Sequence, residues 1–552
     1  MSKKQAVPAI LGLCLVGIIV LLWSLFGPAP RLQISKETTF VTSPLHDDGT
    51  PNYAAYLLER SKKGVTSENN AGVLLQQVIG IPSEHRELIE KEIGCDLSKK
   101  SESEPTIVTC LEKLYALIDS TETARYHETH GDLGSDEMLV VDDVALFDLM
   151  QSRAWSPKEH ASKATLIREY SEAIDAIVKA SERPRFYMPL PDAFSNQERS
   201  IVLQSLFSTA PRECVDVLLI RAMLLLGEGN LESAWQDVYS AMRLARLITQ
   251  NTPLTHQLIG HLLDEKASKA LLAILDSPEL SIELAAKIQK DLSTLSPFEL
   301  QHTIDQHERI SFLDLAARRA KGKSVGNAKS NYKTRIDSNE VLRHGNEMFD
   351  YIVSLTTMSY PEYRNSMKAD FNRFSDLHDR EDEANMVAKC LSPSLRNRLT
   401  ADELLKVCVP PVQAFLSSQV RANTRCDLSK VAMALHRFRK NNSAYPESLT
   451  ELVPKYLPQV PVDRFANQPL NYEKKTAGYC LYSNGPNQEA DGGTSLSGNP
   501  KDGEWVKKPE TVTNMSFDVV IRLPLPNDFW PEPIVRTASD DPYETGYGPR
   551  KD

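Results

Sequence analysis

The sequence DLSKVAMALHRFRK (427–440) opens the stretch that decides the fold, which runs on through YPESLTEL (445–452), PLNYE (469–473), YCLYS (479–483) and FDVVIRL (517–523). In the first segment, apolar residues recur at steps of three and four, which is typical of one buried face of a helix. Asp427 suits the N-cap of this helix, and basic residues complement its carboxyl end. We therefore expect a helix from Asp427 that ends at Asn441 and Asn442.

The segments after this helix predict a short helix and a small sheet. Residues 445–452 fit a second helix, because Pro446 occupies the first turn, where proline is tolerated. The aromatic runs 469–473 and 479–483 are joined by a turn containing Gly478, which indicates a β-hairpin. The β-branched run 517–523 adds a third strand, and three strands suffice to bury the apolar face of a helix.

In their order, these segments resemble the C-terminal half of the major pseudopilin of type II secretion. The similar features are the helix, YPESLTEL (445–452), VDRFANQPLNY (462–472), YCLYSNGPN (479–487) and DGG (491–493). The resemblance implies the local fold of a helix beneath a small antiparallel sheet. Pseudopilins carry a processing site running directly into this helix, and the chain has none there. Assembly into a pilus is therefore not expected.

Length and charge limit the classes of function. The chain has 552 residues, enough for several structural units and more than one apolar core. Its formal net charge is −11, and no basic patch interleaved with aromatic residues occurs. Because nucleic-acid binding requires a basic footprint that displaces phosphate counterions, we expect no nucleic-acid partner.

The leading segment predicts a membrane anchor. Residues 9–26 are apolar without a charged residue, follow Lys3 and Lys4, and precede Gly27-Pro28-Ala29-Pro30. The run is just long enough to cross a bilayer and also fits a secretory signal. We favour an uncleaved anchor because residues 26–30 make a poor small-residue cleavage site. Lysines on the leading side place the protein in the cytoplasmic membrane as a single-pass protein, with the bulk of the chain in the periplasm or outside.

We predict an α+β fold: a mainly α-helical exported region, a small C-terminal helix-plus-antiparallel-sheet domain and a single N-terminal transmembrane helix. The expected regions are an anchor (1–27), an extended linker (28–52), an α-helical domain (53–425), a pseudopilin-like domain (426–523) and a Pro-rich disordered tail (524–552). Within the helical domain we expect a flexible loop (321–335) and one tetratricopeptide-like hairpin (215–250). Gly229 matches the turn of that hairpin, and small residues at 234 and 241 let the two helices approach.

Export makes the cysteines of interest, because disulfides persist in oxidising compartments. Cys95 with Cys110 and Cys390 with Cys408 are two candidate pairs, and free core thiols are the alternative for each. The sequence contains no CxxC motif, so it does not support thioredoxin-like chemistry or a cysteine-rich zinc site.

Several groups of histidines and carboxylates invite comparison with known sites. His127 and His130 are three residues apart, whereas a zinc-protease helix places its ligands at i and i+4, so we expect a polar surface loop. We also expect the carboxylates between Asp136 and Asp143 to edge a solvated loop, and His256 and His261 to be packing residues.

A second polar cluster lies on a predicted helix and comprises His302, Asp305, His307 and Glu308. The spacing puts His302 and Asp305 on one face with Arg309, while His307 points elsewhere. No G-x-S-x-G, G-x-x-x-x-G-K-[ST] or G-x-G-x-x-G motif occurs, so the common hydrolase and phosphate-binding signatures are missing.

The loop from Asn484 to Gly503 is the best candidate for a ligand site. Asn487, Glu489, Asp491 and Asp502 offer hard oxygen ligands, and nearby glycines let backbone carbonyls turn inward, as calcium sites require. The corresponding loop binds calcium in pseudopilins, so the resemblance implies calcium here. Plain turn chemistry is the alternative.

Two functions remain open. The first is a membrane-anchored, exported interaction or scaffold protein whose pseudopilin-like head faces an envelope protein partner. The second is an exported hydrolase with a site in the helical domain that uses residues such as His302 or Glu308. A deep pocket with converging carboxylate and histidine side chains would favour the hydrolase.

Overall fold

The computed structural model describes residues 3–79, 90, 106–130, 137–140, 143–188, 210–250, 252–320, 334–369, 386–408, 412–493, 519–525 and 534–537. The fold is α+β, mostly helical with a small antiparallel sheet. In the first half of the chain the helices are α1 (Lys3–Phe26), α2 (Tyr53–Lys62), α3 (Ala71–Ile79), α5 (Ile107–His130), α6 (Asp143–Ser152), α7 (Ala161–Glu169), α8 (Ser171–Ser181), α10 (Ala210–Gly227), α11 (Leu231–Leu247) and α12 (Leu254–Asp276). In the second half they are α13 (Ile282–Thr294), α14 (Gln301–Thr303), α15 (Arg309–Ala320), α16 (Ser338–Thr356), α17 (Tyr360–Ala369), α19 (Met386–Leu391), α20 (Pro393–Cys408) and α21 (Val412–Asn442).

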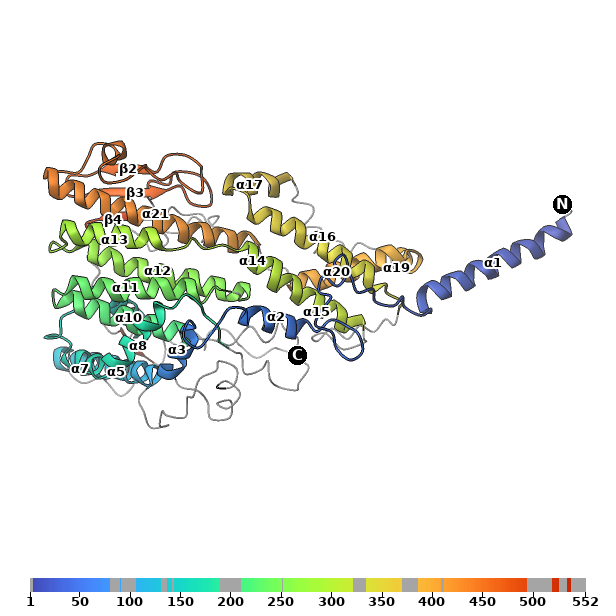
Figure 1. The fold of residues 1–552 in the computed structure, drawn as a ribbon, viewed down its shortest axis with the longest axis horizontal. Helices are drawn as coiled ribbons and strands as arrows, with labels where there is room; N and C mark the ends of the chain where they lie inside the picture. Colours follow the sequence, from blue (N-terminus) through green and yellow to red (C-terminus); the bar gives the residue numbers. More distant parts are fainter. Residues whose placement is uncertain are drawn as a thin grey trace.

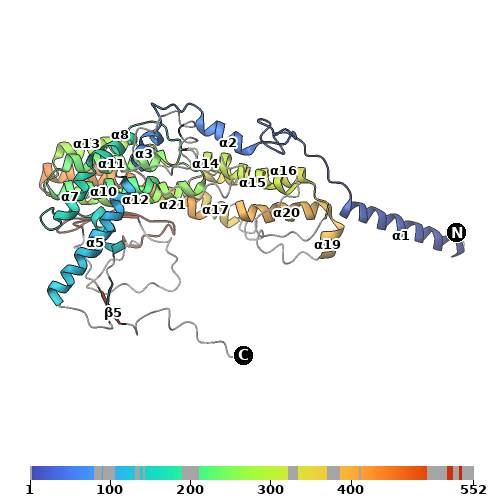
Figure 2. The same ribbon diagram turned by 90° about the horizontal axis from the view of Figure 1, so that it is seen from below.

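The elements form an elongated body from which α1 projects at one end (Figures 1 and 2). Helices α19 and α20 lie at that end, and the sheet lies at the opposite end beside the carboxyl-terminal half of α21 (Figure 1). Within the described part of the chain, no helix combines the length and the apolarity that a bilayer span needs.

The hairpin predicted at 215–250 consists of α10 and α11, and α12 packs on it as the next antiparallel helix. Gly229 has φ +81 in the turn, a conformation that favours glycine. The Asn230 side chain then caps α11 by accepting a hydrogen bond from the Ser233 backbone N–H. Ala234 and Ala241 are fully buried, so the small side chains lie inside the packed helices.

Buried ion pairs join these helices to one another. Each of the three cations is at most 15% exposed and each partner carboxylate at most 6%. The pairs are Arg221–Asp237 at 2.7 Å, Arg246–Asp264 at 2.6 Å and Lys266–Asp216 at 2.7 Å. Removing one partner from such a pair leaves an uncompensated charge, so the pairs fix the register in which α10, α11 and α12 pack.

Helix α21 begins at Val412, so the prediction that it starts at Asp427 was wrong. Asp427 lies inside the helix, where its carboxylate pairs with Lys430 at 3.2 Å and with Arg464 at 2.7 Å. The boundary expected between 425 and 426 therefore falls within one continuous helix. The same helix packs against α12 and α13 and carries the sheet, so the head is built onto the helical region.

The sheet has the order β2-β3-β4, with β2 (Asn471–Lys474), β3 (Tyr479–Ser483) and β4 (Val519–Leu523) all antiparallel. In the hairpin, Tyr472 pairs with Leu481, and Leu481 pairs in turn with Ile521. The Leu481 and Tyr479 side chains are fully buried. The predicted three-stranded sheet over a helix is thereby confirmed.

The segment between α21 and the sheet is less helical than predicted. Residues 445–452 contain only a 3-10 helix (η4) at Leu449–Leu452, capped by a reciprocal hydrogen-bonded pair between Ser448 and Glu451. The next segment turns on Asp463, which is buried and accepts hydrogen bonds from the Phe465 N–H, the Ser483 hydroxyl and the Asn484 N–H. This carboxylate ties the VDRF segment to the end of β3.

Four segments expected to lack regular structure or packing differ from expectation. Residues 28–52 lie against the body: Thr38, Thr39 and Val41 are buried, and Asn346 in α16 donates hydrogen bonds to the Glu37 and Thr38 carbonyls. His127 and His130 lie in α5 and not in a loop. Part of the Asp136–Asp143 segment forms β1 (Glu137–Val140), which pairs with β5 (Ile534–Thr537) in the tail that was expected to be disordered. Pairing between segments this far apart in the sequence leaves no local signal in either of them.

The described cysteines include free thiols at Cys110, Cys390 and Cys408, so the Cys390–Cys408 disulfide is absent from the structure. Burial raises the pKa of the Cys110 thiol to about 12 and of the Cys408 thiol to about 12. These two are core thiols, the alternative that the sequence left open. Cys95 and most of the predicted loop at 321–335 lie outside the described residues.

We predict that Gly345→Ala destabilises the body. A Cβ at Gly345 in α16 would lie 1.9 Å from Cε1 of Phe312 in α15, and overpacking of this kind costs about 1–3 kcal/mol. The measurement is thermal unfolding of the purified chain in detergent. Gly17→Ala is the matched control, because a Cβ there meets nothing within 4 Å. Equal melting temperatures for the two variants would show that α15 and α16 are not packed this closely.

Candidate functional site

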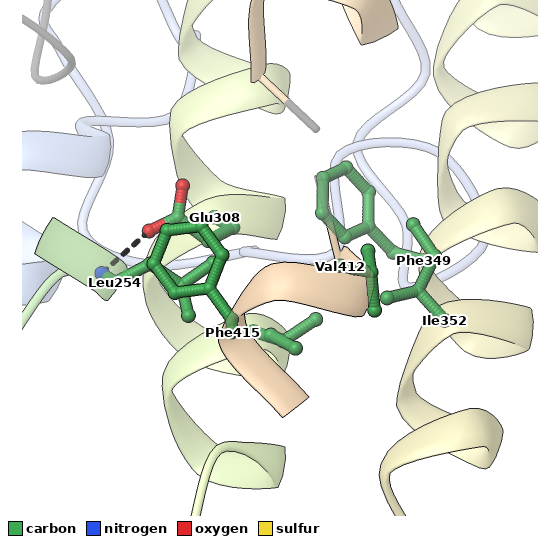
Figure 3. A pocket seen from close by; sticks show the side chains of 7 residues that line it. Leu254, Glu308, Phe349, Ile352, Val412 and Phe415 are labelled. Atoms are coloured by element: carbon green, nitrogen blue, oxygen red, sulfur yellow. Dashed lines mark hydrogen bonds between the residues drawn. The ribbon is translucent and has the colours of Figure 1, made fainter. Parts of the chain in front are cut away.

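The polar cluster at 302–308 lies in a continuous helix whose geometry changes from α-helical to π-helical and back. Helix α14 continues into a π-helix, η3 (Ile304–Glu308), and then into α15. A π-turn widens a helix and re-aims its side chains, and such turns are frequent at functional sites. Residues of η3 line a small cavity together with the first residues of α12 and of α21 (Figure 3).

Glu308 is the last residue of the π-helix, and its carboxylate points at the amino end of α12 (Figure 3). Its Oε1 accepts a hydrogen bond of 2.9 Å from the Leu254 backbone N–H. Pro253 precedes Leu254 at the N-cap and offers no side-chain cap, so a carboxylate distant in sequence satisfies an N–H that would otherwise have no partner in the helix. The positive end of the helix dipole also favours a negative group at this position.

The surroundings of this carboxylate are apolar. Burial raises the pKa of Glu308 to about 7, and the hydrogen bond from Leu254 opposes that rise. A small cavity of about 10 Å³ adjoins it, lined by Leu254, Ile304, Glu308, Phe349, Ile352, Val412 and Phe415. This volume admits at most one water molecule, whereas small-molecule sites occupy about 300–1,000 Å³. The arrangement therefore caps a helix and holds no substrate-sized space.

The other members of the cluster do not converge on Glu308 as a ligand set. Asp305 pairs with Arg309 at 2.8 Å, as the predicted shared face requires, and Arg309 also pairs with Asp350 at 2.6 Å. His302 is exposed, whereas His307 is buried. Partial desolvation of the ring lowers the pKa of His302, and nearby Arg60 lowers it further. Among the described residues, no group of three or more His, Cys, Asp or Glu side chains is placed to hold a metal ion.

His256 and His261 are buried, as expected of packing residues. His261 Nδ1 lies 3.0 Å from the Ser418 hydroxyl, and its ring meets Phe298 edge-on at 4.7 Å. Burial lowers the pKa of His261 to about 3, so the ring is neutral. A histidine–serine contact of this kind bridges α12 and α21, and its imidazole is too weak a base to activate a nucleophile near neutral pH.

The loop predicted to bind calcium is described as far as Gly493, so Asp502 lies outside the described residues. Glu489 and Asp491 are exposed. Asn487 donates a hydrogen bond from Nδ2 to Asp491 at 2.8 Å, and its Oδ1 accepts one of 3.2 Å from the Glu489 N–H. These contacts form a turn in which the amide and one carboxylate engage each other.

Comparisons with protein-family models, with curated proteins and with solved structures found no match.

The contacts that sequence reasoning missed lie at the base of α1. Arg396 in α20 donates from Nη2 to the Ser24 carbonyl at 2.7 Å and to the Ser24 hydroxyl at 3.1 Å. The Arg335 guanidinium lies 4.7 Å from the centre of the Trp23 ring. No local signal could have revealed these contacts, because the partners lie hundreds of residues apart.

We predict that Glu308→Gln removes a pH dependence of stability. A carboxyl whose pKa is raised by folding stabilises the folded state fully below its unfolded pKa, and this stabilisation is lost as the pH rises through the folded pKa of about 7. Between about pH 5 and pH 8 the free energy of unfolding of the wild type should therefore fall by about 2 kcal/mol relative to Glu308→Gln. Denaturant titrations at both pH values measure this difference.

The glutamine keeps an oxygen acceptor for the Leu254 N–H, so a simple loss of the hydrogen bond is not confused with the loss of charge. Glu283→Gln, on the exposed face of α13, is the matched control and should follow the wild type. Parallel pH profiles for the wild type and Glu308→Gln would mean that Glu308 ionises as readily in the folded chain as in the unfolded one.

The calcium site remains a prediction of its own. We expect metal analysis of the purified chain to find calcium that is absent from Asp491→Ala, because a carboxylate is a hard oxygen ligand. Asp48→Ala, in an exposed loop near the start of the chain, is the control and should retain the metal. Equal metal content in the wild type and Asp491→Ala would remove this loop as a calcium site.

Proposed function

We propose that this chain is a membrane-anchored scaffold, in which α1 inserts into the cytoplasmic membrane and the body stands on its outer side to meet an envelope protein partner. The observation that carries this proposal is the exposure of the apolar side chains of α1. Leu13 is 73% exposed and Val20 is 62% exposed, and the helix projects clear of the body (Figures 1 and 2). Apolar surface of this extent is costly in water and favourable in lipid.

The aromatic and basic residues of the leading segment support the same proposal. Trp23 and Phe26 are exposed near the end of α1 that meets the body, where aromatic side chains favour the membrane–water interface. Lys3 and Lys4 begin the segment, and lysines on a short leading side favour retention of that side in the cytoplasm. The body would then lie in the periplasm or outside the cell.

The position of the sheet supports a head that faces away from the membrane. The three-stranded sheet and the carboxyl end of α21 lie at the end of the body opposite α1 (Figure 1). The long helix beneath antiparallel strands supports the resemblance of this region to a pseudopilin head as a proposal about local fold. In this arrangement α14, α15 and α16 lie between the head and the bilayer (Figure 1).

The hydrolase proposal has less support. Its two named residues lie in different surroundings. His302 is exposed, whereas the Glu308 carboxylate caps α12. The cavity beside Glu308 is too small for a substrate. No observation favours this second function over a scaffold.

We predict that Val16→Arg with Ile19→Arg releases the chain from membranes. A central arginine costs about 2.5–3.5 kcal/mol in an inserting helix, so the double variant should move from the carbonate-resistant membrane fraction to the supernatant. Val144→Arg in α6 is the matched control, because Val144 is exposed on the body at 66%, and it should remain in the membrane. A wild-type chain found in the soluble fraction would contradict the proposed anchor.

The partner and the orientation are tested in the same cells. Protease added to spheroplasts should digest the body without lysis, as expected for a body outside the cytoplasm. A photo-crosslinking residue at Val462, which is 52% exposed at the sheet end, should capture an envelope protein that the same residue at Val144 does not. Protection of the body from protease would place it in the cytoplasm.

A further inference from the structure

At the end of the body from which α1 departs, three arginines form no ion pair with another described residue. The three lie on segments that join there, and we call them the arginine collar: Arg31, Arg335 and Arg396. Arg396 is 6% exposed in α20, Arg335 precedes α16, and Arg31 follows α1 by a few residues. Backbone contacts hold the three segments together, because Arg335 N–H donates to the Leu25 carbonyl at 2.6 Å and Asn339 donates to the Arg31 carbonyl at 3.0 Å.

Arg396 is the centre of the collar, and all of its hydrogen-bond acceptors are neutral. Besides Ser24, it donates from Nη1 to the carbonyls of Lys389 and Cys390 at 2.9 and 2.8 Å. Its Nε is buried without a hydrogen-bond partner among the described residues. The guanidinium thus joins the carboxyl ends of α1 and α19, whose helix dipoles favour a cation, but no carboxylate balances it.

Two nearby carboxylates form hydrogen bonds with amide groups and no ion pair with the collar. Asp337 caps α16 by accepting a hydrogen bond from the Asn339 N–H at 2.9 Å. Glu340 accepts one of 2.6 Å from the Asn397 side chain. Within the described part of the chain, no ion pair includes any arginine of the collar. Burial lowers the pKa of Arg396, and the charge of Arg335 adds to this effect.

Three other arginines with little exposed surface have acidic partners. Arg221, Arg246 and Arg309 each lie within 2.8 Å of a carboxylate. A buried cation is costly unless an opposite charge is close. Arg396 departs from this pattern, and it does so at the base of the helix proposed to enter the membrane.

Apolar side chains surround the collar. Leu391, at the end of α19, is 62% exposed, and Trp23 and Phe26 on α1 are 49% and 65% exposed. Both views place α19 at the end of the body that faces α1 (Figures 1 and 2). Cationic and aromatic groups beside exposed leucine match the chemistry of the headgroup layer, where phosphates lie above the first carbons of the acyl chains.

We propose that the arginine collar binds the phosphate groups of anionic lipids and seats the end of the body on the membrane surface. This inference rests on the proposed function, because it takes α1 to lie in the bilayer. The guanidinium groups of Arg31 and Arg335 have the geometry for bidentate contact with a phosphate, while Arg396, whose Nη atoms are hydrogen-bonded, holds α1 to the body. The lipid phosphates place negative charge beside these arginines, and Leu391 enters the headgroup boundary next to them.

The test uses the full chain with a solvatochromic fluorescent amino acid in place of Leu391, reconstituted in two kinds of vesicle. One kind contains phosphatidylcholine alone, and the other contains phosphatidylcholine with phosphatidylglycerol. The expected result is a blue-shifted emission in the anionic vesicles that is absent from the neutral ones. High salt should abolish the shift, because the screening length falls to about 3 Å at about 1 M.

Arg31→Glu with Arg335→Glu should remove at least half of that shift, since repulsion replaces attraction. Lys179→Glu with Lys290→Glu, two exposed lysines of α8 and α13, makes the same change in net charge elsewhere and should keep the shift. Arg396 is left intact because its contacts hold α1 to the body. Circular dichroism of each variant checks that the helices are retained.

Flotation of the same samples separates this inference from the proposed function. Flotation with both kinds of vesicle, but equal emission in both, would overturn the collar and leave the anchor standing. A chain that floats with neither kind would overturn both. An equal shift for the collar and control variants would show that the contact depends on overall charge and not on the collar.

Discussion

The burial of α21 on two sides is the constraint on which the rest of the structure depends. Leu428, Ala432 and Leu435 are fully buried, and the helix packs on α12 and α13 while the sheet covers another face. A sheet of three short strands is only marginally stable by itself, so the strands depend on packing against this helix. Because α21 also reaches back to Val412 and the cavity beside Glu308, the head and the helical region share one core and one axis.

Buried polar groups then decide which of many helix packings is formed. Apolar burial is non-directional, and a set of helices rich in leucine and alanine could pack in several registers. The ion pair Arg221–Asp237 fits only one register of α10 against α11, because a shift would leave each charge buried without its partner. Glu308 acts in the same way at a distance, because the start of α12 must lie where this carboxylate can accept the Leu254 N–H. The same burial disfavours the ionised form of the carboxyl group, which is why the pKa of Glu308 is raised.

The sequence was informative where a structure is determined by neighbours along the chain. Helical periodicity identified α10 and α11, and two short aromatic runs joined by a turn at Gly478 identified β2 and β3. The start of α21 was misplaced because Asp427 has the chemistry of an N-cap. Inside the helix its carboxylate pairs with Lys430 and with Arg464, which approaches from another segment. The contact of Arg396 with Ser24 spans 372 residues, and β1 pairs with a strand near the end of the chain. Periodicity carries no information about pairings of this range.

The attachment of α1 to the body bears on how the proposed scaffold would work. A spacer between a membrane and a distant head keeps its geometry only if its attachment to the membrane is itself stiff. One transmembrane helix joined to a flexible linker would let the body tilt freely. Residues 28–52 do not act as such a linker, because Thr38 and Asn346 fasten them to α16, and Arg396 fastens the last turn of α1 to α20. The direction of α1 is thereby coupled to the long axis of the body, so a helix held upright in a bilayer would hold the sheet at a defined height above it.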